Sequence, residues 1–288
     1  MTSCLPVKNF FSVRIGSVPL TPLTPRPTLG PRSTVPRRVD NLTVLTMEVI
    51  AHRGASYEAP ENTLASLRLG WAQATTCEID VRPTSDGHIL VCHDANTQRT
   101  TGIDKVIARH TLTELQRLDA GSWKDSRHAS ERLPSLVEVL EALPSGKSLL
   151  IEAKGNALIV PALKKELEAS GKLGQCAVQS FDYPTCVAAK KTLSKVQVFF
   201  LSYLNGTTPP SPEQLIEKAR SANLDGLGLQ DHPMIDARFV QKIHEAALKI
   251  NVWTVDASDE ARRLRDCGVD GLITNRPGWI CDQLKFPT

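Results

Sequence analysis

Several side chains that can carry out acid–base chemistry lie beside short apolar runs in the first third of the chain. His52 and Arg53 follow one such run, and His93 closes another. Glu78 and Asp80 alternate with apolar residues, so an extended chain points both carboxylates to the same side. A cluster of buried acids needs a cation, and two imidazoles beside it indicate proton transfer. The pattern therefore predicts metal-assisted acid–base chemistry.

A third carboxylate fits the same pattern further along the chain. Glu152 lies late in the apolar run 148–153, and Lys154 stands two residues on, on the same face. Glu152 would repel Glu78 and Asp80 in one desolvated site unless a cation joined them. Ligands that are all oxygen suit Mg²⁺ or Ca²⁺ better than zinc. We therefore predict one divalent cation at these three carboxylates.

Positioning these side chains requires strands that end at one place, and from Glu48 onward short β-rich runs alternate with amphipathic stretches. The predicted strands are 48–52, 76–82, 148–153, 175–180, 196–202, 224–229, 249–255 and 269–274. The predicted helices are 61–74, 134–143, 156–170, 183–193, 211–222, 235–247, 258–266 and 277–285. Eight strand–helix units within 47–288 predict one α/β domain, a (β/α)8 TIM barrel. A doubly wound open sheet is the alternative, but the regular repetition favours the closed barrel.

In this arrangement the candidate residues fall at the carboxyl ends of strands, where barrel enzymes build their active sites. Trp253 lies in the strand 249–255 and is predicted to form a platform at the pocket rim, with ordinary packing as the alternative. Gly54 is expected to permit a tight turn. Glu61 and Asn62 follow a proline and are interpreted as a helix start, with a functional contact as the other interpretation.

One connection, from His93 to Pro134, is longer than the others. It contains a short predicted helix near Thr113–Leu118 and a polar segment after it. A loop of this length over a compact domain often covers a functional mouth, although an insertion without function would look the same in sequence.

The charge of the chain is unevenly distributed. Residues 1–46 carry six basic side chains and one acidic side chain, a net charge of +5, whereas the remainder carries −2. A mildly acidic body argues against nucleic-acid binding. No apolar run approaches the roughly 18 residues that indicate a transmembrane span. The seven cysteines show no CxxC spacing, which favours a reducing, cytoplasmic location and argues against structural zinc.

The segment 1–46 differs from the rest of the chain in composition. It holds seven of the 19 prolines with many Ser and Thr residues and has no apolar period, so we predict a disordered tail. Its Arg-rich, acid-poor composition also fits an organellar transit peptide, the alternative to a cytoplasmic location. Because Met47 stands immediately before the first strand, a third interpretation is an extension from a misassigned start codon.

Four stretches of the body together resemble the glycerophosphodiester phosphodiesterase family. They are HRGASYEAPENT at 52–63, CEIDVRPTSDGHILVCHD at 77–94, IEAK at 151–154 and VDGLITNRP at 269–277. The resemblance covers about 48–284, and the motifs are specific as a set, whereas HRG alone would be weak. The family has a (β/α)8 barrel, which agrees with the count of strands and helices.

The resemblance implies a role for each candidate side chain. His52 and His93 would be the general acid and base, and Arg53 would bind the phosphate with Lys154 nearby. The metal ligands that it implies are Glu78, Asp80 and Glu152. The chain departs from the family pattern at Ala153, usually Ile, and at Asn275, usually Asp. Ala153 faces away from the site, and Asn275 is expected to alter a capping or supporting role without removing a catalytic group.

The predicted function is hydrolysis of a small-molecule glycerophosphodiester to glycerol 3-phosphate and an alcohol. The attacking group is either water or the glycerol 2-hydroxyl through a cyclic phosphate. The alternative function is a phospholipase-D-like or cyclising phosphodiesterase acting on lysolipids. A sugar-phosphate isomerase or aldolase is less favoured because no Gly-rich loop follows Val255. A non-catalytic barrel is a further possibility, and the sequence does not indicate the oligomeric state.

Overall fold

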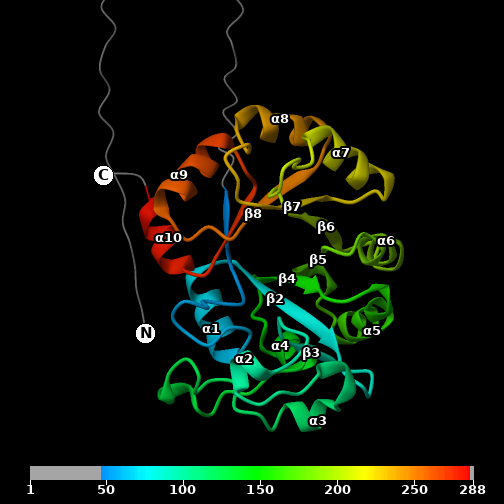
Figure 1. Ribbon diagram of the computed structural model, residues 1–288, viewed down its shortest axis with the longest axis vertical. Coiled ribbons are helices and arrows are strands. Elements are labelled where there is room, and N and C mark those ends of the chain that lie inside the picture. The colour runs from blue at the N-terminus through cyan, green and yellow to red at the C-terminus, as the bar shows by residue number, and fades with distance from the viewer. Residues whose placement is uncertain (1–46, 286–288) are drawn as a thin grey trace, which may run out of the picture. The chain divides into compact units, whose positions relative to one another are not determined.

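The computed structural model describes residues 47–285, and these form a closed barrel of eight parallel strands surrounded by helices (Figure 1). The barrel strands are β1 (Glu48–Ala51), β2 (Thr76–Pro83), β4 (Ser148–Ala153), β5 (Cys176–Ser180), β6 (Gln197–Ser202), β7 (Gly226–Gln230), β8 (Lys249–Trp253) and β9 (Gly271–Thr274). Strand β1 pairs with both β2 and β9, which closes the sheet. The predicted TIM barrel and its eight strands are confirmed.

A helix follows each barrel strand on the outside, and Figure 1 shows these helices as a ring around the strands. They are α1 (Leu64–Gln73), α4 (Leu136–Ala142), α5 (Val160–Ser170), α6 (Tyr183–Thr192), α7 (Pro212–Ser221), α8 (Ala237–Glu245), α9 (Ser258–Cys267) and α10 (Pro277–Leu284). Every one of them lies within a predicted helical stretch or within one residue of it. Several begin at a side-chain cap, as at Ser211, whose hydroxyl accepts from the backbone of Gln214.

The prediction missed a ninth strand. Strand β3 (Ile89–Val91) pairs antiparallel with the end of β2, with Pro83 opposite Ile89. The sequence shows this segment as the apolar run that His93 closes, but it is not among the predicted strands. The turn between the strands contains Gly87, with a φ of +80°.

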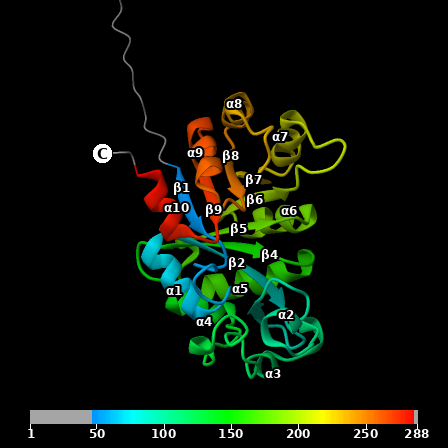
Figure 2. The ribbon, with the colours of Figure 1, turned by 60° about the vertical axis from the view of Figure 1, so that its left-hand side comes forward.

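The long connection after β3 packs against the barrel through its own small apolar cluster, which includes Leu90, Ile107 and Leu115. Its helices are α2 (Gln98–Thr101), η1 (Ile107–Arg109), α3 (Leu112–Leu115) and η2 (Ser126–His128). Two further single turns are η3 (Ala157–Ile159) and η4 (Leu173–Gln175). Figure 2 shows α2 near the end toward which the arrow of β2 points, so the connection lies on the carboxyl side of the barrel.

The core has two layers because strand residues alternate between the barrel interior and the helices. Ile50, Leu150, Phe199 and Ile273 fill the interior as one cluster. A larger cluster of outward-facing strand residues and inward-facing helix residues lies between the barrel and its helices, and it includes Ala153. Ala153 therefore faces away from the interior, as its alternation in the sequence predicts.

The predicted disordered tail, 1–46, lies outside the described residues, as does Cys4. The six cysteines within the described part of the chain are all free thiols, four of them buried. Over the same residues, no helix has both the length and the apolar character that crossing a membrane would require.

Candidate active site

The strand register brings the predicted acidic residues together inside the carboxyl end of the barrel. Asp80 in β2 is directly opposite Glu152 in β4, and Glu152 is opposite Gln179 in β5. Glu78 lies two residues before Asp80 on the same strand and so points to the same side. One oxygen from each of the three carboxylates lies within 4.8 Å of the others, and all three residues are buried.

Two cationic side chains of the chain itself approach this cluster. Lys154 Nζ lies 2.6 Å from Glu152 Oε1 and 3.0 Å from Asp80 Oδ1. Arg53 Nε lies 3.1 Å from Asp80 Oδ2, and the backbone N–H of Arg53 donates to Glu78 Oε2 at 3.0 Å. The other oxygen of Glu78 accepts only a long hydrogen bond, 3.4 Å, from Gln179. Among the described residues, no lysine or arginine side chain forms an ion pair with Glu78, and the nearest ring nitrogen is that of His52, at 4.0 Å.

The pKa values of the cluster reflect this uneven compensation. Burial and the neighbouring carboxylate of Asp80 raise the pKa of Glu78 well above its usual value. The same two causes raise the pKa of Glu152 to about 7. Burial also acts to raise the pKa of Asp80, but Arg53 and Lys154 together hold it well below its usual range. If all three carboxylates were ionised, they would carry more negative charge than Arg53 and Lys154 neutralise, and the raised pKa values reflect this.

The three carboxylates fit a divalent cation. Asp80 Oδ1 is buried without an aligned hydrogen bond, although Lys154 Nζ is within ion-pair distance, so this oxygen is available to a metal. The donor set consists of carboxylate oxygens on two adjacent strands, which suits a hard cation such as Mg²⁺ or Ca²⁺ and not zinc.

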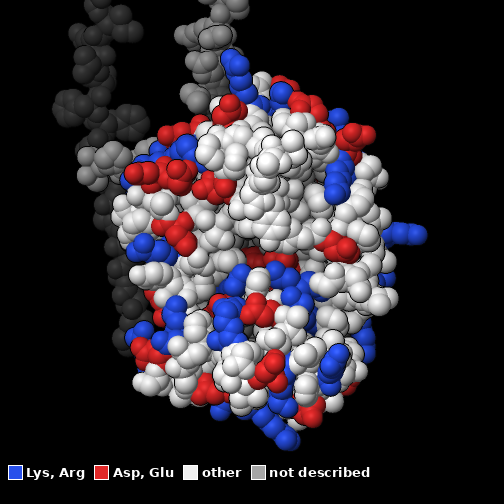
Figure 3. Space-filling view, in the orientation of Figure 1, with Lys and Arg blue, Asp and Glu red and all other residues white. Residues whose placement is uncertain are grey.

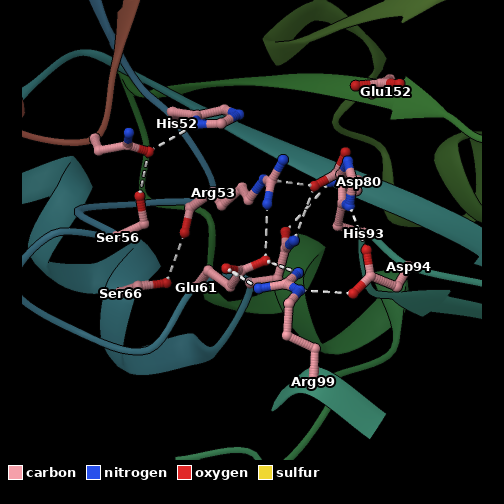
Figure 4. Close-up of polar contacts among 12 residues, drawn as sticks. His52, Arg53, Ser56, Glu61, Ser66, Asp80, His93, Asp94, Arg99 and Glu152 are labelled. Carbon is pink, nitrogen blue, oxygen red and sulfur yellow. Dashed lines mark hydrogen bonds and ion pairs between the residues drawn. The ribbon is translucent and has the colours of Figure 1, made fainter. Parts of the chain in front are cut away.

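His52 follows β1 and is oriented by a chain of hydrogen bonds (Figure 4). Its Nδ1 lies 2.7 Å from Asn275 Oδ1, which also accepts from the hydroxyl of Ser56. The amide nitrogen of Asn275 donates to Asp256 at 2.6 Å. Because a carboxylate only accepts, Asp256 fixes the direction of the Asn275 amide, and His52 must donate from Nδ1. Its Nε2 is then unprotonated in the neutral ring and lies 4.0 Å from Glu78.

Burial, reinforced by the adjacent Arg53, lowers the pKa of His52 to about 4. The ring is therefore neutral near pH 7. His93 is less buried, and burial also lowers its pKa. Its Nδ1 lies 2.7 Å from a carboxylate oxygen of Asp94, so this ring also donates from Nδ1 and presents Nε2 as the acceptor.

Arg53 and His93 are linked through Glu61, for which a functional contact was one interpretation of the sequence, and through Arg99 and Asp94, which the sequence did not identify (Figure 4). Glu61 accepts from Arg53 at 2.9 Å and from two nitrogens of Arg99, each at 2.8 Å. Arg99 Nε in turn donates to Asp94 at 2.7 Å. Arg99 in helix α2 of the long connection thereby contacts the partners of both Arg53 and His93, which supports the interpretation that this connection covers a functional mouth.

The backbone around Arg53 explains why these groups converge. Arg53 and Asn62 adopt φ values of +53° and +58°, and Gly54 adopts +79°. A Cβ at Gly54 would lie 2.4 Å from the backbone of Ser66, so the predicted tight turn is confirmed and also packs against α1. Asn62 donates to Asp80 Oδ2 at 2.9 Å and accepts from its backbone N–H, which holds this strained residue in place.

The interpretation of Glu61 as a helix start is wrong. Helix α1 begins at Leu64, and its cap is Thr63, whose hydroxyl accepts from the backbone of Ser66. Proline at position 60 followed by Glu61 is a common helix-start pattern, but here the chain makes one further turn first. That turn directs Glu61 toward Arg53, and the alternative interpretation, a functional contact for Glu61 and Asn62, is the one the structure supports.

Trp253, the last residue of β8, lines the same cavity as the two candidate acid–base histidines and two of the candidate metal-binding carboxylates, those of Glu78 and Glu152. The cavity measures about 180 Å³. Beside Trp253 it is lined by Phe181 and Tyr203, which follow β5 and β6 and which sequence patterns did not single out. A larger cavity of about 400 Å³ lies at the amino end of the barrel, lined in part by Glu48 and Asp270, and it contains none of the candidate residues.

Comparisons with known proteins agree with this site. A sequence profile of the glycerophosphoryl diester phosphodiesterase family matches residues 52–279. The Bacillus subtilis protein YhdW is 34% identical over 241 residues, which cover 81% of this chain and 96% of that protein. A glycerophosphodiester phosphodiesterase from Caldanaerobacter subterraneus subsp. tengcongensis is 32% identical over 246 residues, with coverage of 82% and 97%. A solved Oleispira antarctica phosphodiesterase in complex with the product sn-glycerol-3-phosphate aligns with a TM-score of 0.71 and 30% identity, covering 83% of this chain and 97% of its own.

Proposed function

This chain belongs to the glycerophosphoryl diester phosphodiesterase family, and we propose that it hydrolyses glycerophosphodiesters with His52 and His93 as its acid–base pair. The enzyme class, a phosphoric diester hydrolase, follows from membership of the family. The products that we propose are glycerol 3-phosphate and an alcohol. The support for this assignment is the convergence of a buried carboxylate cluster, two oriented imidazoles and two cationic side chains on one cavity.

The phosphate is bound by Arg53 and Lys154 in this proposal. Both side chains line the cavity, and both are held in place by buried carboxylates. A guanidinium suits two phosphate oxygens at once, and Arg53 keeps nitrogen donors beyond those that face Glu61 and Asp80. A divalent cation held by the carboxylate cluster would neutralise the non-bridging oxygens and polarise the phosphorus.

Proton transfer is assigned to the Nε2 atoms of the two histidines. Asn275 and Asp94 hold the Nδ1 protons, which leaves each Nε2 free to accept or return a proton at the substrate. One ring, neutral and unprotonated at Nε2, accepts the proton of the attacking hydroxyl or water. The other ring enters the step as the imidazolium, protonated at both nitrogens, and donates its Nε2 proton to the departing alkoxide. Each such transfer contributes about 10²–10⁴-fold to the rate.

A small substrate is favoured over a lysolipid by the size of the cavity. Its 180 Å³ is below the roughly 300–1,000 Å³ that drug-sized ligands occupy. The product complex of the Oleispira relative, which contains sn-glycerol-3-phosphate, also supports a small glycerophosphodiester. The cation, Mg²⁺ or Ca²⁺, and the cytoplasmic or organellar location stay predictions from the sequence.

The test is hydrolysis of glycerophosphocholine by the purified chain with Mg²⁺ or Ca²⁺ and, separately, with chelator. We expect glycerol 3-phosphate to form with Mg²⁺, with Ca²⁺ or with both, and we expect none to form in chelator. His52→Ala and His93→Ala should each abolish turnover while the circular dichroism spectrum stays unchanged. His232→Ala, which alters a histidine outside the cavity, is the control. Near-normal rates in either site variant would remove the acid–base assignment. Accumulation of a cyclic phosphate would identify the glycerol 2-hydroxyl as the nucleophile.

A further inference from the structure

Three aromatic side chains form one wall of the active-site cavity. Phe181 and Tyr203 stack with ring centroids 4.7 Å apart and an interplanar angle of 21°. Trp253 stands at 82° to both, with its centroid 5.4 Å from each. The three rings follow or end strands β5, β6 and β8, so they gather at the carboxyl mouth of the barrel. We call Phe181, Tyr203 and Trp253 the aromatic wall.

The wall faces the part of the cavity that does not bind the phosphate. The same cavity is lined by Arg53, His93 and Lys154, which come from or adjoin β1, β3 and β4. Figure 3 shows the resulting asymmetry around a hollow near the middle of this face, with Lys and Arg side chains along its lower edge and uncharged surface above it. A diester whose phosphate lies on the basic side therefore has one of its two alcohol groups directed toward uncharged surface.

The aromatic wall distinguishes between kinds of ammonium group. Tyr203 is 53% exposed, so its ring is open to a ligand. Among the described residues that line the cavity, the carboxylates are Glu78 and Glu152, and both belong to the metal-binding cluster. A primary ammonium group needs a carboxylate or another strong acceptor, whereas a quaternary ammonium group has no N–H to satisfy and is attracted by aromatic faces.

On the premise of the proposed function, we propose that the aromatic wall binds the alcohol half of the substrate and selects a quaternary ammonium alcohol, as in a glycerophosphocholine. A primary ammonium would lose hydration at the ring faces without gaining a carboxylate, because the two carboxylates that line the cavity belong to the metal-binding cluster. The wall thus sets the order of preference among headgroups, and Tyr203 is the specificity-determining residue most exposed to the ligand.

The decisive comparison uses two substrates of the same shape. Glycerophosphocholine and its 3,3-dimethylbutyl analogue differ only in that carbon replaces the charged nitrogen. We expect kcat/KM to be about 2- to 30-fold higher for the choline diester, the range that cation–π contacts produce. Glycerophosphoethanolamine and glycerophosphoinositol complete the panel and should be slower than the choline diester.

Variants at the aromatic wall test whether the ring of Tyr203 causes the preference for the choline diester. Tyr203→Leu should reduce the choline advantage over the dimethylbutyl analogue toward one, whereas Tyr203→Phe, which keeps the ring, should retain it. Tyr57→Leu is the matched control, because Tyr57 is similarly exposed, at 59%, but does not line the cavity. Thermal unfolding of each variant excludes a loss of fold as the cause.

The outcomes separate this inference from the proposed function. Equal rates for the choline diester and its uncharged analogue, or equal rates across all headgroups, would overturn the inference while the phosphodiesterase assignment stands. A preference that survives in Tyr203→Leu would also overturn it. Hydrolysis of none of the diesters would overturn both.

Discussion

His52 and His93 are held by partners of different charge. A neutral amide oxygen of Asn275 accepts from His52, whereas a carboxylate of Asp94 accepts from His93. A carboxylate stabilises the imidazolium form of the ring that it holds, and an amide does so much less. The resemblance noted in the sequence leads us to expect Asp at position 275, and with Asn there the support of His52 is geometric more than electrostatic. The amide can play this part only because Asp256 fixes which of its ends faces the ring.

We therefore expect Asn275 to act as a positioning residue. Asn275→Leu removes the acceptor for His52 Nδ1, so kcat should fall about 10–100-fold with little change in KM. Asn275→Asp restores an acceptor but places a carboxylate against Asp256, and it should also be impaired. The double variant Asn275→Asp with Asp256→Asn again pairs a donor with an acceptor and should recover most of the activity. Nitrogen NMR of His52 reports the tautomer directly, and a normal kcat in Asn275→Leu would contradict the assignment.

The sequence identified the residues that carry charge or a titratable ring and gave Asn275 a capping or supporting role, but it did not identify the other residues that orient the site. Asp94 and Asp256 look like ordinary acids that follow strands, and Arg99 lies in a polar connection. Their roles depend on side-chain contacts between segments separated by up to 38 residues, as in the pair formed by Arg99 and Glu61. A single sequence shows how the strands are spaced along the chain, but it does not show which loops contact one another in the fold. These supporting residues were therefore missed for a physical reason.

At the scale of elements, the turn after β1 determines whether the site assembles. The prediction of strands and helices succeeded because the alternation of apolar runs is regular, whereas the start of α1 was misplaced by one turn. That turn, residues 52–63, contains three residues with positive φ and connects His52 to α1. Its conformation is fixed by contact of Gly54 with Ser66, which no local pattern encodes.

Replacing Gly54 tests how strongly the turn depends on this contact. Gly54→Ala combines the cost of positive φ, about 1–2 kcal/mol, with a clash against Ser66 backbone atoms at 2.4 Å. Gly87→Ala is the matched control, because Gly87 has a φ of +80° and nothing within 4 Å of its added Cβ. Urea unfolding should show a larger loss of stability for Gly54→Ala, by about 1–3 kcal/mol, and activity should fall in that variant alone. Equal losses in the two variants would show that the contact does not constrain the turn.

At the scale of the whole molecule, the ionised carboxylate cluster that a cation would bind lowers the stability of the metal-free fold. Glu78 and Glu152 have pKa values raised in the folded state, so the stability they contribute is fully present below about pH 4.5 and is lost as pH rises through their folded pKa, about 7 for Glu152. His52 changes stability in the opposite direction. Its pKa is lowered in the folded state, so the fold loses stability only as pH falls below about 6.5, where the unfolded chain gains a proton that the folded chain does not. Between about pH 6.5 and pH 8 the carboxylates therefore dominate, and the metal-free protein should become less stable as pH rises.

A bound divalent cation should reverse this loss, since it binds only the deprotonated carboxylates. At about 100 times its dissociation constant, the cation stabilises the fold by about 2.7 kcal/mol, which raises Tm by about 5–10 °C in a domain of this size. Scanning calorimetry with Mg²⁺ or Ca²⁺ should show a larger rise near pH 8 than near pH 6. Glu78→Gln should abolish the rise and, in chelator near pH 8, should be more stable than the native chain because it removes a buried charge. Glu168→Gln, at an exposed acid on α5, should behave like the native chain. A rise in Tm independent of pH, or one that persists in Glu78→Gln, would place the cation elsewhere and show that the buried acids are tolerated for another reason.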